Sequence, residues 1–319
     1  MKITILDGFT VNPGDLDWGI LEPYGSVTVY DRTDSDTESI ERIGNSEVVL
    51  VNKTPLPASV IEACPSIRMI GMLATGYNIV DVEACAKRGI PVTNVPSYGT
   101  AAVAQFTMAL MLEMCHRIGL HNHSVHQGDW ANAETFCYWL TPQMELAGKT
   151  LGIIGFGRIG QAVGKLAKAF GMNVIAYNRS QCEEGRRIAE YVDLETIFAK
   201  SDIVSLHCPQ TAETQNLINA KTIAKMKDGA MLVNTARGGL VDEDALVAAL
   251  EAGKLRYAAV DVVSKEPMPL DNPLLKTRKC IITPHIAWAP VESRQRLLDT
   301  VVENIRCYLE GNPQNVVNL

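Results

Sequence analysis

Three glycines in the middle of the chain are spaced to bind a phosphate group. Gly155, Gly157 and Gly160 have the spacing G-x-G-x-x-G, directly after an apolar run at 151–154 that suits a buried strand. The first glycine permits a tight turn, the second lets the backbone approach a pyrophosphate, and the third lets a helix pack closely on the strand. Because the first turn of that helix offers N–H groups to an anion, the segment predicts a dinucleotide-binding site.

Three polar residues further along the chain could bind an anion or transfer a proton. Arg237, Glu266 and His285 each follow a strand-like run, so we expect all three at the same edge of a parallel sheet. Each also has an ordinary interpretation, as a surface cation, a loop acid before Pro267 and a histidine in a turn. Taken singly, the ordinary interpretations are favoured.

The elements that must position these residues alternate between strands and helices. Before the glycines, strands are expected at 3–6, 27–30, 48–51, 69–73 and 91–95, with helical segments at 60–63 and 80–88. After them, strands are expected at 173–177, 203–207, 230–234, 258–262 and 280–283. This alternation predicts two α/β units, each built on a parallel sheet.

A chain of 319 residues exceeds the usual size of one hydrophobic core, so two domains are expected. The final helix, 291–309, follows the last strand of the second unit and could cross back to the first. Turn signals at 96–99 and 284–290 mark the hinges. We expect two Rossmann-like, doubly wound domains with the active site in the cleft between them. These are a discontinuous substrate domain, 1–98 plus 287–319, and a dinucleotide-binding domain, 99–286.

Composition argues against several classes of protein. The net charge of −7, with no run of Lys or Arg, argues against a nucleic-acid surface. The eight cysteines form no C-x-x-C pair, so a reducing cytoplasm is favoured over a zinc site or a disulfide framework. No export signal is visible at the N-terminus. The apolar stretch 101–115 is too short for a membrane span and is interpreted as a buried or subunit-interface helix.

Three histidines form the one cluster that could suggest a metal. His121, His123 and His126 are spaced by two, three and five residues, which does not place all three on one face of a helix. We therefore expect no metal site and interpret these histidines as a solvated helix surface.

Several ordered motifs make the chain resemble the D-isomer-specific 2-hydroxyacid dehydrogenase family over nearly its full length. They are the glycine turn, His207-Cys-Pro209 followed by Thr211-Ala-Glu-Thr214, Asn234-Thr-Ala-Arg-Gly238, Glu266-Pro267 and Pro284-His285. Several motifs at family-like separations are more specific than any one of them. Within the family, the segments 73–77, 98–100 and 285–288 look most like the glycerate dehydrogenase, or hydroxypyruvate reductase, branch.

The resemblance implies hydride transfer between NAD(P)H and a small 2-oxo acid, with hydroxypyruvate or glyoxylate reduced to D-glycerate or glycolate. Arg237 would hold the carboxylate and carbonyl of the acid with its planar fork. His285 would be the general acid during reduction and the general base during oxidation. Glu266 would bond the other imidazole nitrogen, orient the ring and favour its protonated form.

The resemblance also implies the remaining site residues. The turn 73–76 would offer backbone N–H groups to the substrate carboxylate, and Trp139 could come from a partner subunit in a homodimer formed through helix 101–115. The substrate-binding candidates are Asn52, Lys53, Ala74, Thr75, Gly76, Trp139 and Trp288. The cofactor-binding candidates are Gly155, Phe156, Gly157, Arg158, Ile159, Gly160, Asn178, Arg179, Ser180, His207, Cys208, Pro209, Thr214, Thr235, Ala236 and Asp261.

The end of the second strand bears on the choice of cofactor. NAD-binding members usually have an acidic residue there that bonds the adenosine ribose, whereas this chain has Tyr177-Asn-Arg-Ser180. Asn178 can bond a ribose without repelling phosphate, and Arg179 and Ser180 could bind a 2′-phosphate, so we expect a shift from NAD towards NADP. Two alternatives stay open: another member of the family, of the D-lactate or 3-phosphoglycerate type, and a non-catalytic, nucleotide-sensing corepressor-like protein on the same fold.

Overall fold

The computed structural model describes residues 1–318 and divides into two compact units. Unit 1 comprises Met1–Gly99 and Ala289–Leu319, and unit 2 comprises Thr100–Trp288. The expected limits, 1–98 with 287–319 and 99–286, differ from these units at Gly99, Ala287 and Trp288. Each unit contains one sheet whose strand pairs are all parallel, and the predicted α/β fold class is confirmed.

Unit 1 is built on a five-stranded sheet with the order β2-β1-β3-β4-β5. Its strands are β1 Lys2–Ile5, β2 Ser26–Val29, β3 Val48–Val51, β4 Met69–Met72 and β5 Val92–Thr93. Its helices are α1 Asp36–Ile43, α2 Ala58–Ala63, α3 Val82–Lys87 and α11 Val291–Leu309, with 3-10 helices at Gly8–Thr10 and Trp18–Tyr24. The central strands β3 and β4 are buried at every residue, as parallel strands covered on both faces must be.

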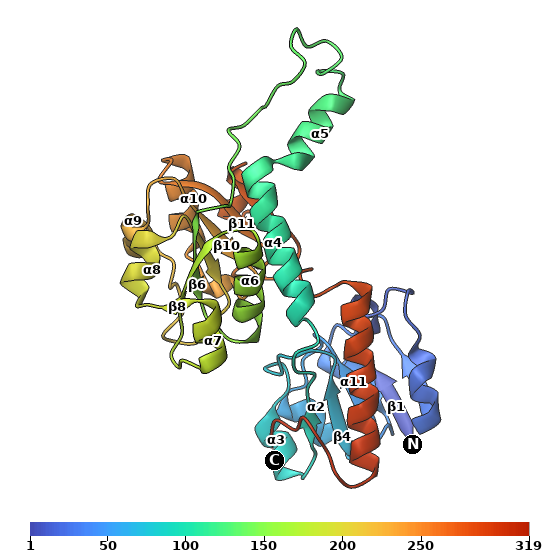
Figure 1. Ribbon diagram of the computed structural model, residues 1–319. Coiled ribbons are helices and arrows are strands. Elements are labelled where there is room, and N and C mark those ends of the chain that lie inside the picture. The colour runs from blue at the N-terminus through green and yellow to red at the C-terminus, as the bar shows by residue number, and fades with distance from the viewer. Residues whose placement is uncertain (319) are drawn as a thin grey trace. The chain divides into compact units, whose positions relative to one another are not determined.

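The C-terminal helix α11 belongs to unit 1, where it contacts β4 (Figure 1). Leu297, Leu298, Val301 and Ile305 are buried and recur at helical spacing, so one side of the helix is apolar. This apolar side explains why the chain returns to its first unit after completing the second.

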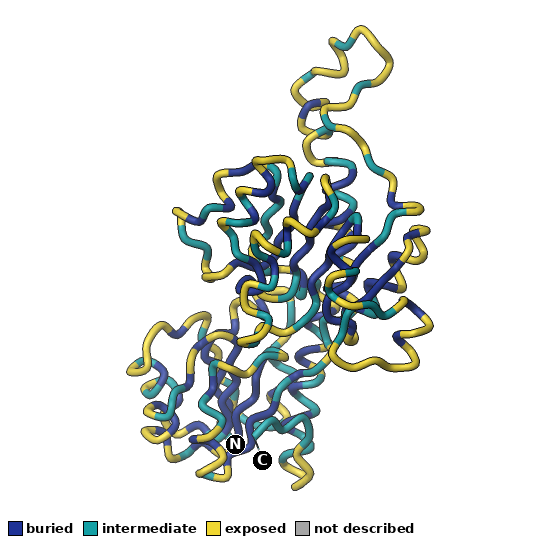
Figure 2. Tube along the Cα trace, turned by 90° about the vertical axis from the view of Figure 1, so that its left-hand side faces the viewer, coloured by how far each residue is buried: buried dark blue, intermediate teal, exposed yellow. Residues whose placement is uncertain are grey.

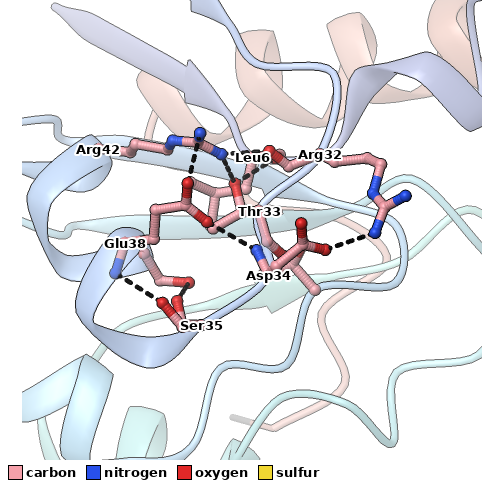
Figure 3. A network of polar contacts seen from close by, with 9 residues as sticks. Leu6, Arg32, Thr33, Asp34, Ser35, Glu38 and Arg42 are labelled. Carbon is pink, nitrogen blue, oxygen red and sulfur yellow. Dashed lines mark hydrogen bonds and ion pairs between the residues drawn. The ribbon is translucent and has the colours of Figure 1, made fainter.

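A polar network holds α1 to the end of β1 (Figure 3). The side chain of Ser35 caps α1 by accepting from the Glu38 N–H at 3.2 Å. Glu38 in turn accepts from the Arg42 guanidinium at 2.8 Å, and Arg42 also donates to the Thr33 hydroxyl at 2.7 Å. Thr33 donates to the carbonyl of Leu6 at 2.5 Å, which fixes the chain just after β1.

Unit 2 is built on a seven-stranded sheet with the order β12-β11-β10-β9-β6-β7-β8. Its strands are β6 Thr150–Ile154, β7 Asn173–Tyr177, β8 Glu190–Tyr191, β9 Ile203–Leu206, β10 Ala230–Asn234, β11 Leu255–Val260 and β12 Cys280–Ile282. Its helices are α4 Thr100–His116, α5 Ile118–His126, α6 Arg158–Ala169, α7 Glu183–Ile188, α8 Leu194–Lys200, α9 Ala220–Lys225 and α10 Glu243–Glu251, with 3-10 helices at Gly238–Leu240 and Pro273–Lys276. Because β6 pairs with β7 on one side and β9 on the other, the strand order reverses at β6.

The apolar helix α4 packs inside unit 2. It contacts α6, β10 and β11, and nine of its residues are buried. No helix within residues 1–318 is long and apolar enough to cross a membrane.

An arm of residues 117–145 extends away from the rest of unit 2 (Figure 1). It consists of α5 and an irregular segment, and most of its residues are exposed (Figure 2). At its base, Arg256 at the amino end of β11 donates to the carbonyl of Pro142. The arm therefore leaves the unit at the amino-terminal edge of its sheet.

The histidines of α5 correct one expectation. His123 and His126 are exposed, but His121 is partly buried, and its Nε2 accepts from the Leu140 N–H at 3.0 Å. The interpretation as a solvated surface is therefore wrong for His121, which joins α5 to the irregular segment of the arm. Because Leu140 lies 19 residues from His121 in the sequence, the spacing of the histidines could not indicate this hydrogen bond.

Candidate active site

The glycine turn lies where the strand order of unit 2 reverses. Gly155 has φ +94°, and a Cβ there would overlap the backbone of Cys208, which follows β9. A Cβ on Gly160 would overlap the carbonyl of Gly155. Both positions therefore admit only glycine, because larger residues would separate β6 from β9 or α6 from the turn.

Gly157 differs from the other two glycines because its surroundings are open. No atom of the described residues lies within 4 Å of the position that its Cβ would take. Gly157 is also the N-cap of α6, and since it has no side chain, the first N–H groups of the helix receive no cap from it. An uncapped 12-residue helix behind an open backbone fits a pyrophosphate group.

The loop after β7 is fastened to this turn. The Asn178 side chain accepts from the Phe156 N–H at 3.1 Å and donates to the carbonyl of Ser180 at 2.7 Å. The Arg179 side chain is exposed. A hydrogen bond from Thr211 lowers the pKa of Glu213, and attraction to Arg179 lowers it further, so the loops after β7 and β9 are neighbours.

Two further cofactor candidates follow β9 and β10. The His207 ring shares a 2.8 Å hydrogen bond with Ser205, and burial lowers its pKa to about 4, so the ring is neutral at pH 7. The Thr235 hydroxyl lies 3.0 Å from that of Thr107 in α4. The structure thus brings the candidates after β6, β7, β9 and β10 to the carboxyl edge of one sheet.

Arg237 stands on a loop that packs directly against the loop carrying Glu266. The Asn234 side chain closes the first loop by donating to the Arg237 carbonyl at 2.9 Å and accepting from the Ala236 N–H at 3.0 Å. A Cβ on Gly238 would overlap the carbonyl group of Val263. The Arg237 side chain is exposed at this junction.

Glu266 and His285 form a hydrogen-bonded pair. His285 Nδ1 lies 2.7 Å from Glu266 Oε2, and Glu266 Oε1 accepts from the Val263 N–H at 3.2 Å. With Glu266 ionised the carboxylate can only accept, so Nδ1 donates and Nε2 is the nitrogen that can exchange a proton. The side chains are 28% and 36% exposed, which leaves the pair accessible.

The loop 283–288, which carries His285 and is called the histidine loop below, depends on Asp261 for its conformation. His285 has φ +56°, and its N–H donates to the carbonyl of Asp261 at 2.8 Å. The buried Asp261 carboxylate accepts from the Thr283 hydroxyl at 2.6 Å, the Ile286 N–H at 2.9 Å and the Ala287 N–H at 2.8 Å. These bonds give Asp261, expected at the cofactor, a role in positioning His285 that the sequence did not indicate. Trp288 lies on the same loop, and its indole N–H donates to the His285 carbonyl at 2.8 Å.

The substrate candidates of unit 1 follow β3 and β4. Asn52 is buried, and its side chain donates to the Leu73 carbonyl at 2.5 Å and accepts from the Thr10 hydroxyl at 3.2 Å. Lys53 is exposed. The Thr75 hydroxyl donates to the Val95 carbonyl at 2.7 Å, so the turn 73–76 is fixed to the segment after β5.

Within unit 2, Trp139 does not lie near Arg237 and His285 of its own chain. It is 69% exposed and lies on the arm, which leaves unit 2 at the edge opposite Arg237 and His285. Within residues 1–318, no group of three or more His, Cys, Asp or Glu side chains could hold a metal ion.

Comparison with known proteins identifies the family of this chain. The family model described as "D-isomer specific 2-hydroxyacid dehydrogenase, NAD binding domain" matches residues 108–287. The chain belongs to the D-isomer specific 2-hydroxyacid dehydrogenase family. The predicted resemblance is thereby confirmed, and this 2-hydroxyacid dehydrogenase is an oxidoreductase with a nicotinamide cofactor.

The relatives of this 2-hydroxyacid dehydrogenase match it over most or all of its length. A hydroxypyruvate reductase of Blautia hydrogenotrophica is 52% identical, covering 100% of both chains. A glycerate dehydrogenase of Methylorubrum extorquens is 40% identical, covering 90% of both. Among solved structures, an acyclic imino acid reductase in complex with NADPH and D-Arg has a TM-score of 0.86 and 31% identity, covering 99% of this chain and 100% of that one.

Proposed function

We propose that this 2-hydroxyacid dehydrogenase uses NAD(P)H to reduce small 2-oxo acids, with hydroxypyruvate the main substrate and glyoxylate a second one. The observation that carries the proposal is the 2.7 Å pair of His285 and Glu266, because Glu266 stands on a loop packed against the one that carries Arg237. The 52% identical hydroxypyruvate reductase, which matches from end to end, supports this choice of acid.

The proposed roles follow from the geometry. Arg237, exposed beside the pair, binds the carboxylate and carbonyl oxygens of the acid through its planar guanidinium. His285 Nε2 gives its proton to the carbonyl oxygen while Glu266 holds the opposite side of the ring. The dihydronicotinamide supplies the hydride when it is bound. In the oxidative direction, Nε2 accepts the hydroxyl proton.

Unit 1 contributes to binding of the acid in this proposal. Lys53 supplies a positive charge, and the turn 74–76 supplies backbone N–H groups for the carboxylate. This turn is held in place through Thr75 and Asn52. Trp288, anchored on the His285 carbonyl, shapes the site from unit 2.

NADPH is proposed as the preferred cofactor. Asn178 stands at the end of β7 in place of the usual acid, so no carboxylate there repels a 2′-phosphate. Its side-chain amide bonds the Phe156 N–H and the Ser180 carbonyl. Arg179 and Ser180 are exposed beside it. The structural relative in complex with NADPH supports this preference.

We further propose a homodimer in which the arm of one subunit covers the other and supplies Trp139 to its active site. The arm exposes several large apolar side chains, namely Ile118, Val125, Trp130, Phe136, Trp139 and Leu140. The Phe136 side chain is 89% exposed, and exposing so large an apolar side chain to water is unfavourable unless a partner covers it. A reducing, cytoplasmic setting is supported by the eight cysteines, all of which lie within residues 1–318 as free thiols.

The test is an assay of the purified protein against hydroxypyruvate, glyoxylate, pyruvate, 3-phosphohydroxypyruvate and a branched 2-oxo acid, each with NADPH and NADH. We expect the largest kcat/KM with hydroxypyruvate and NADPH. A larger kcat/KM with another acid would overturn hydroxypyruvate as the main substrate. A larger kcat/KM with NADH would overturn the proposed preference for NADPH. Binding of NADPH without oxidation by any of the five acids would favour the non-catalytic alternative.

A further inference from the structure

A buried carboxylate in unit 1 lies directly behind the proposed substrate-binding loop. Asp7 follows β1 and is 7% exposed. Its Oδ1 accepts from the Asn52 N–H at 2.7 Å, and its Oδ2 accepts from the N–H groups of Lys53 and, at 2.7 Å, Thr54. Three consecutive main-chain donors thus converge on one carboxylate that is 45 to 47 residues away in the sequence.

These bonds determine which groups of the loop can meet a ligand. Because the N–H groups of residues 52–54 point at Asp7, they are not offered to a substrate. Asn52 and Thr54 are buried on either side, whereas Lys53 between them is exposed. The loop therefore presents the Lys53 side chain as its group for an anion.

The same carboxylate acts on the neighbouring turn. Asn52, whose backbone is held by Asp7, donates from its side chain to the Leu73 carbonyl at 2.5 Å. Leu73 begins the turn 73–76. On the other side, the Thr54 hydroxyl donates to the Thr33 carbonyl at 3.3 Å, which joins the loop to the network around α1 (Figure 3).

We propose that Asp7 is a positioning residue for the substrate. Through the amides of residues 52–54 it sets the position of Lys53, and through Asn52 it sets the turn 73–76, so that both bind the carboxylate of the 2-oxo acid. Burying a carboxylate costs free energy unless hydrogen bonds satisfy it, and three converging N–H groups provide that compensation. This inference rests on the proposed function and adds to it a residue outside the motifs.

The test is a double-mutant cycle of Asp7→Asn and Lys53→Met in the full-length protein, with hydroxypyruvate and NADPH. An asparagine side chain keeps the shape, but its amide nitrogen cannot accept from the loop. We expect Asp7→Asn to raise KM for the acid about tenfold, with kcat within about threefold and the Kd of NADPH unchanged. The double variant should raise KM by a factor well below the product of the factors found for the two single variants, because Asp7 acts through Lys53.

Asp15→Asn is the matched control. Asp15 is also a carboxylate of unit 1, and it forms a two-point pair with Arg294 at 2.7 and 2.6 Å. Its loss should lower the unfolding temperature without raising KM. Should Asp7→Asn fail to fold, Asp7→Glu keeps an acceptor but moves it by one methylene, and it should still raise KM.

The outcomes separate this inference from the proposed function. Fully multiplicative effects in the cycle, or an unchanged KM in Asp7→Asn or Asp7→Glu, overturn the role of Asp7 while wild-type turnover stands. Wild-type protein that turns over no 2-oxo acid overturns the proposed function, and the inference about Asp7 with it.

Discussion

At the scale of single residues, His285, the residue proposed to transfer the proton, is held from two sides. Glu266 fixes the ring of His285 through Nδ1, and Asp261 fixes its backbone and the residues that follow it. A ring held in this way meets the substrate in one orientation, which is how positioning lowers the barrier of a proton transfer.

Replacing His285 with alanine should abolish most of the activity but not cofactor binding. Proton transfer by a positioned group is typically worth about 10²- to 10⁴-fold, so we expect kcat to fall by that factor. The Kd of NADPH, measured by fluorescence titration, should stay within about twofold, because the glycine turn is untouched. Near-normal turnover would remove His285 from the mechanism.

A second residue-scale prediction concerns His207 and acid stability. Burial lowers the pKa of His207 from 6.5 to about 4, so the unfolded chain takes up a proton before the folded one does as the pH falls. The stability due to the neutral ring is present above about pH 6.5 and is lost as the pH falls towards 4. Between pH 7.5 and 5, wild type should lose about 1 to 2 kcal/mol more free energy of unfolding than His207→Gln, measured by urea titration. Equal losses in the two proteins would contradict this account.

At the scale of elements, the candidate active site depends on loops that pack on one another after parallel strands. Most strands were predicted to within one or two residues, and 48–51, 173–177 and 230–234 match β3, β7 and β10. β11 was predicted at 258–262 but runs from Leu255 to Val260, and the Asp261 carboxylate directly after it holds the loop that carries His285. The two-residue strand β8 was missed, since so short a run has no periodicity.

Substituting Gly238 should disturb catalysis without changing a chemical group. A Cβ there would overlap the Val263 carbonyl, so Gly238→Ala must shift the loop 263–266 and with it Glu266. We expect kcat/KM to fall at least about tenfold, with NADPH binding nearly unchanged. Gly119→Ala on α5 is the control, because the nearest described atom, Glu113 Oε1, would lie 3.6 Å from its Cβ. Equal activity of the two variants would show that the loop tolerates the shift.

At the scale of the whole molecule, the proposed homodimer concerns the arm, whose large apolar side chains are exposed in a single copy of the chain. If Trp139 acts in the partner's site, its loss should lower kcat/KM while the protein stays dimeric in analytical ultracentrifugation. A stacked or packed aromatic of this kind is worth about tenfold in binding.

Mixing two impaired variants tests whether Trp139 acts across subunits. In a hybrid of Trp139→Ala and His285→Ala subunits, one active site would have both an intact His285 and a tryptophan from the partner. We therefore expect mixing and subunit exchange to restore part of the wild-type kcat/KM. If Trp139 acts within its own subunit, every site of the hybrid lacks one group and no activity returns.

The sequence by itself determined the features that depend on a few neighbouring residues. The glycine spacing, the alternation of strands and helices, and the positions of Arg237, Glu266 and His285 after strands are properties of short segments, where backbone conformation is set locally. Only the tertiary structure decided the hydrogen bonds of Asp7, Asn52 and Asp261, and the direction of the arm. Their partners are hydrogen-bond donors or acceptors tens of residues away, and the side chains of the arm face outward without helical periodicity, so no local spacing could indicate them.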